Sequence, residues 1–329
     1  MTVASDYRAV TTLQAFPHLS TQSMFDCGKR PKEASPIDTF LEDTEALNKL
    51  FMSFGSSTLP KPLGSLVLLG YTSAVESFLR AVIRRIVIAD EIARKRSEPL
   101  SLSFGAAFHH ERALMPEALL ERFSFAGRRG IRDAFAEVLG IEIGGSEMEA
   151  AMNEFARICE IRHCCVHRSG RLGSQNAMKL GLQEHSTVLE RPFYPSVDDL
   201  QDIADLLRTF VKTVNNFLFA AIIDRTVHRG GETVPELSWS WSWGWREDRK
   251  PFQRYYDVFA SATDMPKSPS ARSAYESFSV WSGPGGDRWL EKRRAKKAVR
   301  EEKIAVTEAE VDPMATRQGG EAAPPFTAE

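Results

Sequence analysis

The chain has 329 residues, with 42 Lys and Arg against 44 Asp and Glu, and a formal net charge of -2. Hydrophobic residues make up 43% and aromatic residues 10%, enough for one substantial core and a small second one. A nearly neutral total excludes a protein that binds nucleic acid through overall basic charge. Any contact with nucleic acid therefore has to come from a local patch.

Cysteine usage and hydropathy point to a soluble, cytoplasmic protein. Cys27, Cys159, Cys164 and Cys165 lack the regular spacing of a disulfide framework, so reduced thiols are the simplest account. The N-terminal sequence MTVASDYRAVTTLQAF has no apolar signal-like core. The most apolar runs, such as residues 217–223, are far shorter than the roughly 18 residues of a membrane span. We therefore expect no membrane segment.

The N-terminal part divides into an extension and two helices. Residues 1–35 are polar and aperiodic, which predicts a flexible extension. Ser35, Pro36 and Asp38 provide an N-cap, a proline at the first helical position and an acid in the first turn, and so predict a helix. After the break STLPKPLG, apolar residues at helical spacing predict a long helix over about 65–95.

Shorter helices are predicted in the middle of the chain. Two of them cover 116–125 and 130–139 and are separated by AGRRG. Ser146 and Glu149 have the form of a capping box and predict the start of a further helix, which Gly170 ends.

The helical part closes with one more long helix. Residues 176–191 are polar and of mixed propensity, which predicts an ordered loop or a short hairpin. Ser196 and Asp199 then begin a helix whose apolar face continues to about His228. Together these elements predict an all-α protein with an up-and-down helical bundle over residues 36–229.

The C-terminal part has a different composition. Residues 230–304 are predicted to form a Trp-rich extension and a basic helix, and residues 305–329 a disordered tail. The sequence LSWSWSWGWRE has a period of two, which predicts an extended segment with its tryptophans on one side. These are Trp239, Trp241, Trp243 and Trp245. Packing of this strand onto the helical domain is favoured over stacking on unpaired RNA bases.

The segment EIRHCCVHRSGRL, residues 160–172, carries the clearest chemical signal. Arg162 lies on the apolar stripe of its predicted helix, where a guanidinium has to meet a carboxylate, an anion or a partner subunit. Glu76 is a plausible carboxylate, since it lies beside the apolar stripe of the earlier long helix. His167 follows Arg162 by five residues. An arginine that holds phosphate oxygens and an imidazole that moves a proton suffice for phosphodiester chemistry without a metal.

This segment resembles the motif of the HEPN superfamily, many of whose members are metal-independent endoribonucleases in toxin–antitoxin, abortive-infection and RNA-processing systems. Arg162 matches the arginine of the family, His163 its variable polar position and His167 its histidine. Glu76 in an earlier long helix and the intervening ERFSFAGRRGIRDAFAEVLGI extend the resemblance over roughly residues 37–228.

The resemblance implies a function and an assembly. His167 would remove the proton from a ribose 2'-hydroxyl, which attacks the adjacent phosphorus, while Arg162 holds the non-bridging oxygens. The products would carry 2',3'-cyclic phosphate and 5'-hydroxyl ends, so that only RNA is cleaved. No cofactor is required. The resemblance also implies a homodimer, a role in bacterial defence or as a toxin, and, for a toxin, an antitoxin protein as partner.

Three other interpretations remain open. The chain could be a non-catalytic HEPN-like module that binds RNA or dimerises. Arg162 could serve only to pair with Glu76, while His167 caps the C-terminus of its helix, where a cation is favoured by roughly 0.3–1 kcal/mol. Cys159, His163 and His167, spaced four apart, could hold zinc.

Helix geometry sets a condition on the catalytic interpretation. Positions five apart in sequence lie about 140° apart around a helix, so Arg162 and His167 converge only if the helix ends between them or a dimer forms.

Overall fold

The computed structural model describes residues 11, 19–26, 28, 34–54, 59–227 and 236–283. Residues 1–34 form one unit, in which a short turn, η1 (Gln22–Met24), is described, and the chain from Ser35 onward forms another. Most of the predicted N-terminal extension, Cys27, the predicted basic helix and the predicted C-terminal tail lie outside the described residues.

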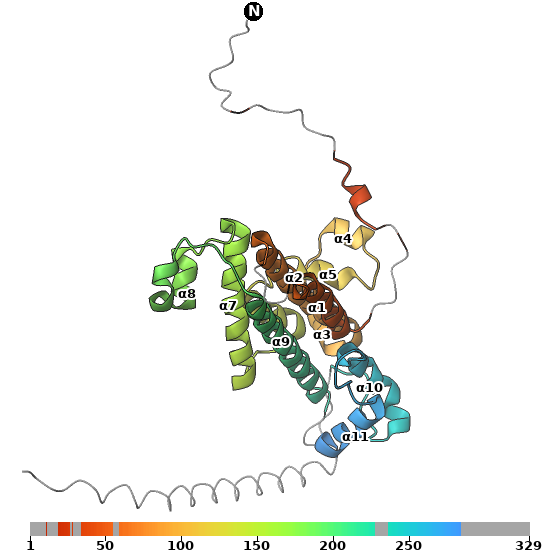
Figure 1. Cartoon of the computed structure of the whole chain (residues 1–329). Coiled ribbons are helices and arrows are strands. Elements are labelled where there is room, and N and C mark those ends of the chain that lie inside the picture. The colour runs from red at the N-terminus through yellow and green to blue at the C-terminus, as the bar shows by residue number, and fades with distance from the viewer. Residues whose placement is uncertain are drawn as a thin grey trace, which may run out of the picture. The chain divides into compact units, whose positions relative to one another are not determined.

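The second unit is built from helices, which confirms the all-α class (Figure 1). Within the described ranges there is no strand, and the β-type contact found there is an isolated bridge between Arg171 and Pro192. The elements are α1 (Pro36–Met52), α2 (Lys61–Ala89), α3 (Glu91–Ser97), α4 (Phe104–His109), α5 (Met115–Leu120), α6 (Arg128–Ala134), the π-helical η2 (Phe135–Leu139), α7 (Ser146–Arg168), α8 (Ser174–His185), η3 (Ser186–Val188), α9 (Val197–Asp224), α10 (Trp245–Phe259) and α11 (Ala271–Ser282).

The long helices α1, α2, α7 and α9 pack against one another and enclose the core. Tyr71 and Phe78 of α2 are fully buried there. Phe155 of α7 and Phe210 of α9 stack with their ring centroids 4.3 Å apart and an angle of 7° between their planes. These contacts fix α7, and therefore the motif at its end, against α2 and α9.

The predicted starts of α1 and α9 are confirmed. Ser35 caps α1, because its hydroxyl oxygen accepts a hydrogen bond from the backbone N–H of Asp38 at 3.3 Å, and Pro36 occupies the first helical position. Ser196 and Asp199 form a complete capping box at the start of α9, in which each side chain accepts from the backbone N–H of the other residue.

The long helix predicted over 65–95 is two helices instead, because the chain leaves helical geometry at Asp90 (φ -107°, ψ 124°). The fully buried Asp90 carboxylate caps α3 by accepting from the N–H of Ala93 at 2.6 Å. It also accepts from the guanidinium of Arg225 and, at 3.1 Å, from the hydroxyl of Tyr255. Both partners are more than a hundred residues away in the chain, so local periodicity does not reveal the break.

The capping box predicted at the start of α7 is wrong. Ser146 is the first helical residue and makes no capping hydrogen bond, while Gly145 occupies the N-cap position. The Glu149 carboxylate instead accepts from Arg128 at 3.0 Å and from Arg132 at 2.5 Å, both on α6. Two charged partners satisfy this carboxylate better than a single backbone N–H would.

The loop or hairpin predicted over 176–191 is also wrong, because most of it is the helix α8. Asn176 and Lys179 of α8 each donate to the Glu160 carboxylate of α7 at 2.8 Å. Gly181, in a left-handed conformation (φ 111°), kinks α8. A glycine inside a helix lowers the helix propensity of the segment, which is why the sequence signal is mixed.

The Trp-rich segment is packed rather than free, but it is irregular coil instead of a strand, and Trp245 begins α10. It packs mainly against α10 and α11, two helices that the sequence did not predict, rather than against the predicted helical bundle. Trp241 is 6% exposed, and its indole N–H donates to the hydroxyl of Thr226 at 2.9 Å. Its ring lies 5.1 Å from that of Phe278 on α11 and 6.3 Å from that of Phe252 on α10, measured between centroids. The helices α10 and α11, blue in Figure 1, pack against each other, and α10 also contacts α2 and α9.

Among the described residues, α2 and α9 are long and apolar enough to cross a membrane by length and composition alone. This differs from the expectation drawn from uninterrupted apolar runs, because a span tolerates a few interspersed polar residues. In this protein 56% of the most apolar stretch of α2 and 44% of that of α9 is buried against other parts of the chain.

Candidate functional site

The four predicted site residues lie on two neighbouring helices. Glu76 projects from the middle of α2, while Arg162, His163 and His167 lie in the last two turns of α7. The predicted partnership is present, since Arg162 Nη2 lies 3.5 Å from Glu76 Oε1. Both side chains are half-buried, 29% and 26% exposed, so the expectation that Arg162 lies on a buried face is only partly met. A guanidinium exposed to this extent remains accessible to an anion.

His163 and His167 form an exposed pair one helical turn apart. Their ring centroids are 4.5 Å apart and their planes are inclined by 50°. Because both rings face solvent beside the C-terminus of α7, a substrate can reach either one. Adjacent imidazoles are suited to removing one proton and supplying another in the same reaction.

The helix does not end between Arg162 and His167. It continues to Arg168 and terminates at Ser169 and Gly170, whose left-handed conformations (φ 51° and 83°) break the helical path. The two side chains therefore leave an unbroken helix about 140° apart. Within one chain they face different directions.

Two of the thiols near the motif are disfavoured as thiolates. Burial raises the pKa of the Cys159 thiol to about 12, and the neighbouring Glu76 carboxylate acts in the same direction. Burial also raises the pKa of Cys165, whose Sγ lies 3.6 Å from the hydroxyl of Ser65 on α2. Protonated thiols are poor nucleophiles and poor ligands.

The zinc hypothesis gains no support from the placement of its residues. Cys159 is buried on the core side of α7, whereas His163 and His167 are exposed. In the part of the chain that the structure describes, no three histidine, cysteine or acidic side chains are grouped so that they could hold a metal ion.

A cavity beside the motif escaped sequence reasoning. It has a volume of about 500 Å³ and lies between the end of α7, α8 and the segment that leads into α9. Its lining includes Cys164, His185, Arg191, Tyr194 and Asp202. The aromatic and proline-rich RPFYP segment, residues 191–195, is the sequence signal that could have indicated this cavity. The approach of this segment to α7, however, depends on how α8 folds.

The elements around the motif are held by ion pairs. Arg168 at the end of α7 donates to the Glu190 carboxylate at 2.5 Å, and the Arg171 side chain donates to the backbone carbonyl of Glu190 at 3.1 Å. The candidate site thus consists of one guanidinium, one carboxylate and two imidazoles on two helices that pack against each other.

Comparison of the chain with protein family models, with curated proteins and with solved structures finds no match.

Proposed function

We propose that the chain is a metal-independent endoribonuclease with a HEPN-like helical domain. The observation that carries the proposal is the arrangement at the end of α7. There Glu76 orients the accessible guanidinium of Arg162, and two exposed imidazoles lie one turn apart on the same helix. These are the groups that phosphodiester cleavage by a 2'-hydroxyl requires.

In the proposed mechanism His167 removes the proton from the ribose 2'-hydroxyl, and the resulting oxyanion attacks the adjacent phosphorus. Arg162 donates to the non-bridging oxygens, where negative charge accumulates. The bond from phosphorus to the 5'-oxygen breaks, and that oxygen takes a proton from His163, whose ring lies 4.5 Å from that of His167. The products are a 2',3'-cyclic phosphate and a 5'-hydroxyl.

The active form is proposed to be a homodimer. Arg162 and His167 diverge on one unbroken helix, so a second motif can supply the missing group. Exposed apolar side chains surround the end of α7 and continue onto α8, and a second copy would cover them. They are Val166, Met178 and Leu182.

The proposed setting is cytoplasmic, in bacterial defence or as a toxin, with an antitoxin protein as a further partner. A second candidate is a non-catalytic HEPN-like module that binds RNA or dimerises. The divergence of Arg162 and His167 favours it, because each side chain could then have a separate, structural role.

Cleavage of a mixed RNA pool by the purified full chain tests the first candidate. Arg162→Ala and His167→Ala should each reduce cleavage by roughly 10²-fold or more, the scale of a lost proton-transfer group or oxyanion donor. Arg157→Ala is the matched control, since Arg157 lies on α7 and pairs with Glu154 on the exposed side. Cleavage should persist in EDTA, and a DNA copy of a cleaved RNA should be inert.

Two outcomes would redirect the assignment. RNA binding without cleavage by the wild-type chain would favour the non-catalytic module. Complete inhibition by EDTA, reversed by zinc, would restore the metal hypothesis at Cys159, His163 and His167.

Mixing two inactive variants tests the dimer. If each site takes Arg162 from one copy and His167 from the other, a mixed dimer of Arg162→Ala and His167→Ala chains contains one intact site. Activity should then reappear on mixing. If one chain supplied both residues, the mixture would stay inactive. A monomer in sedimentation experiments that still cleaves RNA would refute the composite site.

A further inference from the structure

A second cavity lies at the other end of α9, away from the motif. It has a volume of about 760 Å³, is partly open to solvent, and is bordered by the C-terminal half of α9, the end of α10, the loop that follows α10, and α11. Ile37 at the start of α1 also lines it. This volume falls within the range of roughly 300–1,000 Å³ that is typical of small-molecule sites.

The wall of this cavity is largely aromatic. Phe219 of α9 packs edge-on against Tyr256 of α10 with centroids 6.0 Å apart, and its ring lies 5.5 Å from that of Phe259. Phe278 and Trp281 of α11 complete the aromatic lining, and Trp281 is 41% exposed. Such a wall favours a flat, apolar ligand that can stack or pack edge-on against the rings.

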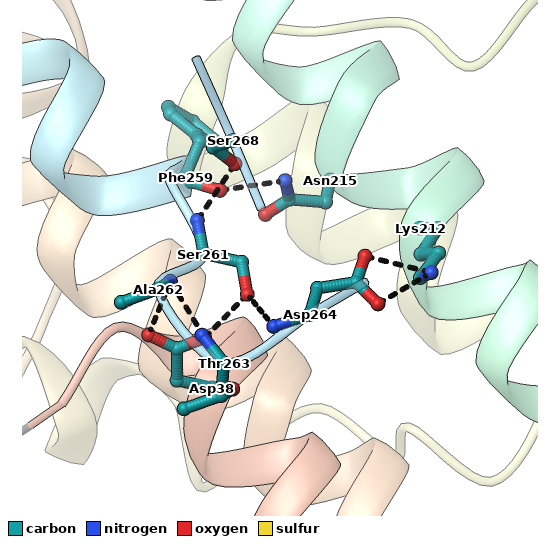
Figure 2. A network of polar contacts seen from close by, with 9 residues as sticks. All are labelled: Asp38, Lys212, Asn215, Phe259, Ser261, Ala262, Thr263, Asp264 and Ser268. Atoms are coloured by element: carbon teal, nitrogen blue, oxygen red, sulfur yellow. Dashed lines mark hydrogen bonds and ion pairs between the residues drawn. The ribbon is translucent and has the colours of Figure 1, made fainter. Parts of the chain in front are cut away.

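One buried side-chain atom in the lining lacks a hydrogen-bond partner. Asn215 is 5% exposed, and its side-chain N–H donates to the carbonyl of Phe259 at 3.0 Å (Figure 2). This bond fixes the amide orientation, because the reverse orientation would set two acceptors against each other. The Asn215 Oδ1 atom is buried and has no partner. A buried acceptor without a donor is a cost to the folded protein that a ligand donor would remove.

The described lining of this cavity has no positive charge left over for an anion. Lys212 Nζ lies 2.8 and 2.7 Å from the two carboxylate oxygens of Asp264. Asp224 adds a second acidic residue to the lining. The cavity therefore disfavours a negatively charged ligand.

The loop that carries Asp264 is held in place from the opposite side. The Asp38 carboxylate accepts from the hydroxyls of Ser261 and Thr263, and from the backbone N–H groups of Ala262 and Thr263, as Figure 2 shows in part. This wall is therefore formed before any ligand arrives, which lowers the ordering cost of binding.

We propose that this cavity binds a planar aromatic molecule that has no negative charge and carries an N–H or O–H donor for Asn215 Oδ1. The aromatic wall selects the flat body, the acidic lining excludes an anion, and the unpaired oxygen selects the donor. Since Oδ1 is closed to solvent, a small displacement of its neighbours accompanies binding. The proposal is independent of the ribonuclease chemistry at α7.

Binding of two matched probes to the full chain tests the proposal. Indole has an N–H donor, and benzofuran is the same shape without one. Indole should bind saturably with one site per chain in calorimetry or ligand-observed NMR. It should bind more tightly than benzofuran by about fivefold, the scale of one neutral hydrogen bond.

Two variants locate the binding. Ser277→Trp should weaken indole binding by roughly tenfold or more, because Ser277 lines the cavity and an added ring fills it. Ser273→Trp is the matched control on the same helix, outside the lining and equally exposed to solvent, and should bind as the wild type does. Asn215→Leu, checked for folding by circular dichroism, should bring the two probes to similar affinities. The proposal is overturned if indole does not bind saturably, if Ser277→Trp binds it unchanged, or if the two probes bind wild-type protein equally.

Discussion

The motif at the end of α7 and the aromatic cluster around Trp241 are built in opposite ways. The motif exposes both of its imidazoles and holds its guanidinium through one half-exposed ion pair. The cluster buries Trp241 against Phe252, Tyr275 and Phe278. Stability should therefore depend on the C-terminal helices and chemistry on α7. Changes in the two regions should have separable effects on unfolding and on activity.

Replacement of Trp241 and Trp243 by alanine should have the largest effect on stability. Removal of a buried aromatic side chain costs about 3–5 kcal/mol, and Thr226 also loses a hydrogen-bond donor. Urea denaturation measures the loss. Val280→Ala on the exposed side of α11 is the control and should change little. RNA affinity per folded molecule should not change, so a stable double variant with weakened RNA binding would contradict the packing role.

Asp38 should make the stability of the C-terminal region sensitive to acid, because its carboxylate holds the loop that follows α10. Burial alone would raise the pKa of its carboxyl, but hydrogen bonds from Ser261, Ala262 and Thr263 outweigh burial and lower the pKa from 3.8 to about 2. Ionised Asp38 therefore stabilises the folded state above pH 4, and this contribution disappears as the pH falls from about 4 to 2. The loss should be about 1–2 kcal/mol.

The comparison of unfolding free energies at several pH values isolates this contribution. Asp38→Asn is the control variant, since it cannot titrate. It should be less stable at neutral pH, but it should lose less stability than the wild type between pH 4 and pH 2. Equal losses in both proteins would show that Asp38 does not control the acid response.

Two serines at the starts of α9 and α7 should differ in their contribution to stability. Ser196→Ala should destabilise the protein by about 1 kcal/mol, because Ser196 caps α9. Ser146→Ala should be close to neutral, because Ser146 makes no capping bond to α7. Thermal unfolding of both variants checks this difference. An equal loss of stability would mean that Ser146 does cap α7 in solution.

Glu76→Gln should have only a small effect on stability, roughly 0–1 kcal/mol, because a partly exposed ion pair contributes little. RNA cleavage should nevertheless fall, since the variant no longer holds Arg162 by charge. Glu154→Gln removes a comparable partner from Arg157 and should leave cleavage unchanged. A large loss of stability with full activity would assign Glu76 a purely structural role.

The long helices could be predicted because their information is local. Ser35 and Ser196 cap the helices that follow them, and the apolar stripes of α1, α2, α7 and α9 coincide with the core. The pairing of Glu76 with Arg162 was also predictable, since each residue lies on or beside the apolar stripe of its amphipathic helix. Hydrophobic periodicity assigns such residues to the correct side of a helix whenever a single face of that helix is buried.

The remaining features depend on contacts between distant residues. The helix break at Asp90 is set by the hydrogen bonds from Arg225 and Tyr255 to the Asp90 carboxylate. The start of α7 lacks the predicted capping box because the Glu149 carboxylate accepts from an arginine of α6 instead. The Trp-rich segment shows a period of two but finds partners in α10 and α11 rather than in another strand. The orphaned oxygen of Asn215 likewise has no local signature.

The buried carboxylate of Asp90 affects how the protein unfolds. This carboxylate is shared by the start of α3, the end of α9 and the middle of α10. Detachment of the C-terminal helices would remove the Tyr255 donor and open the core around this charge. We therefore expect residues 35–283 to lose hydrogen-exchange protection together, in one cooperative transition. A chain cut at residue 229 should not retain the native stability of the bundle.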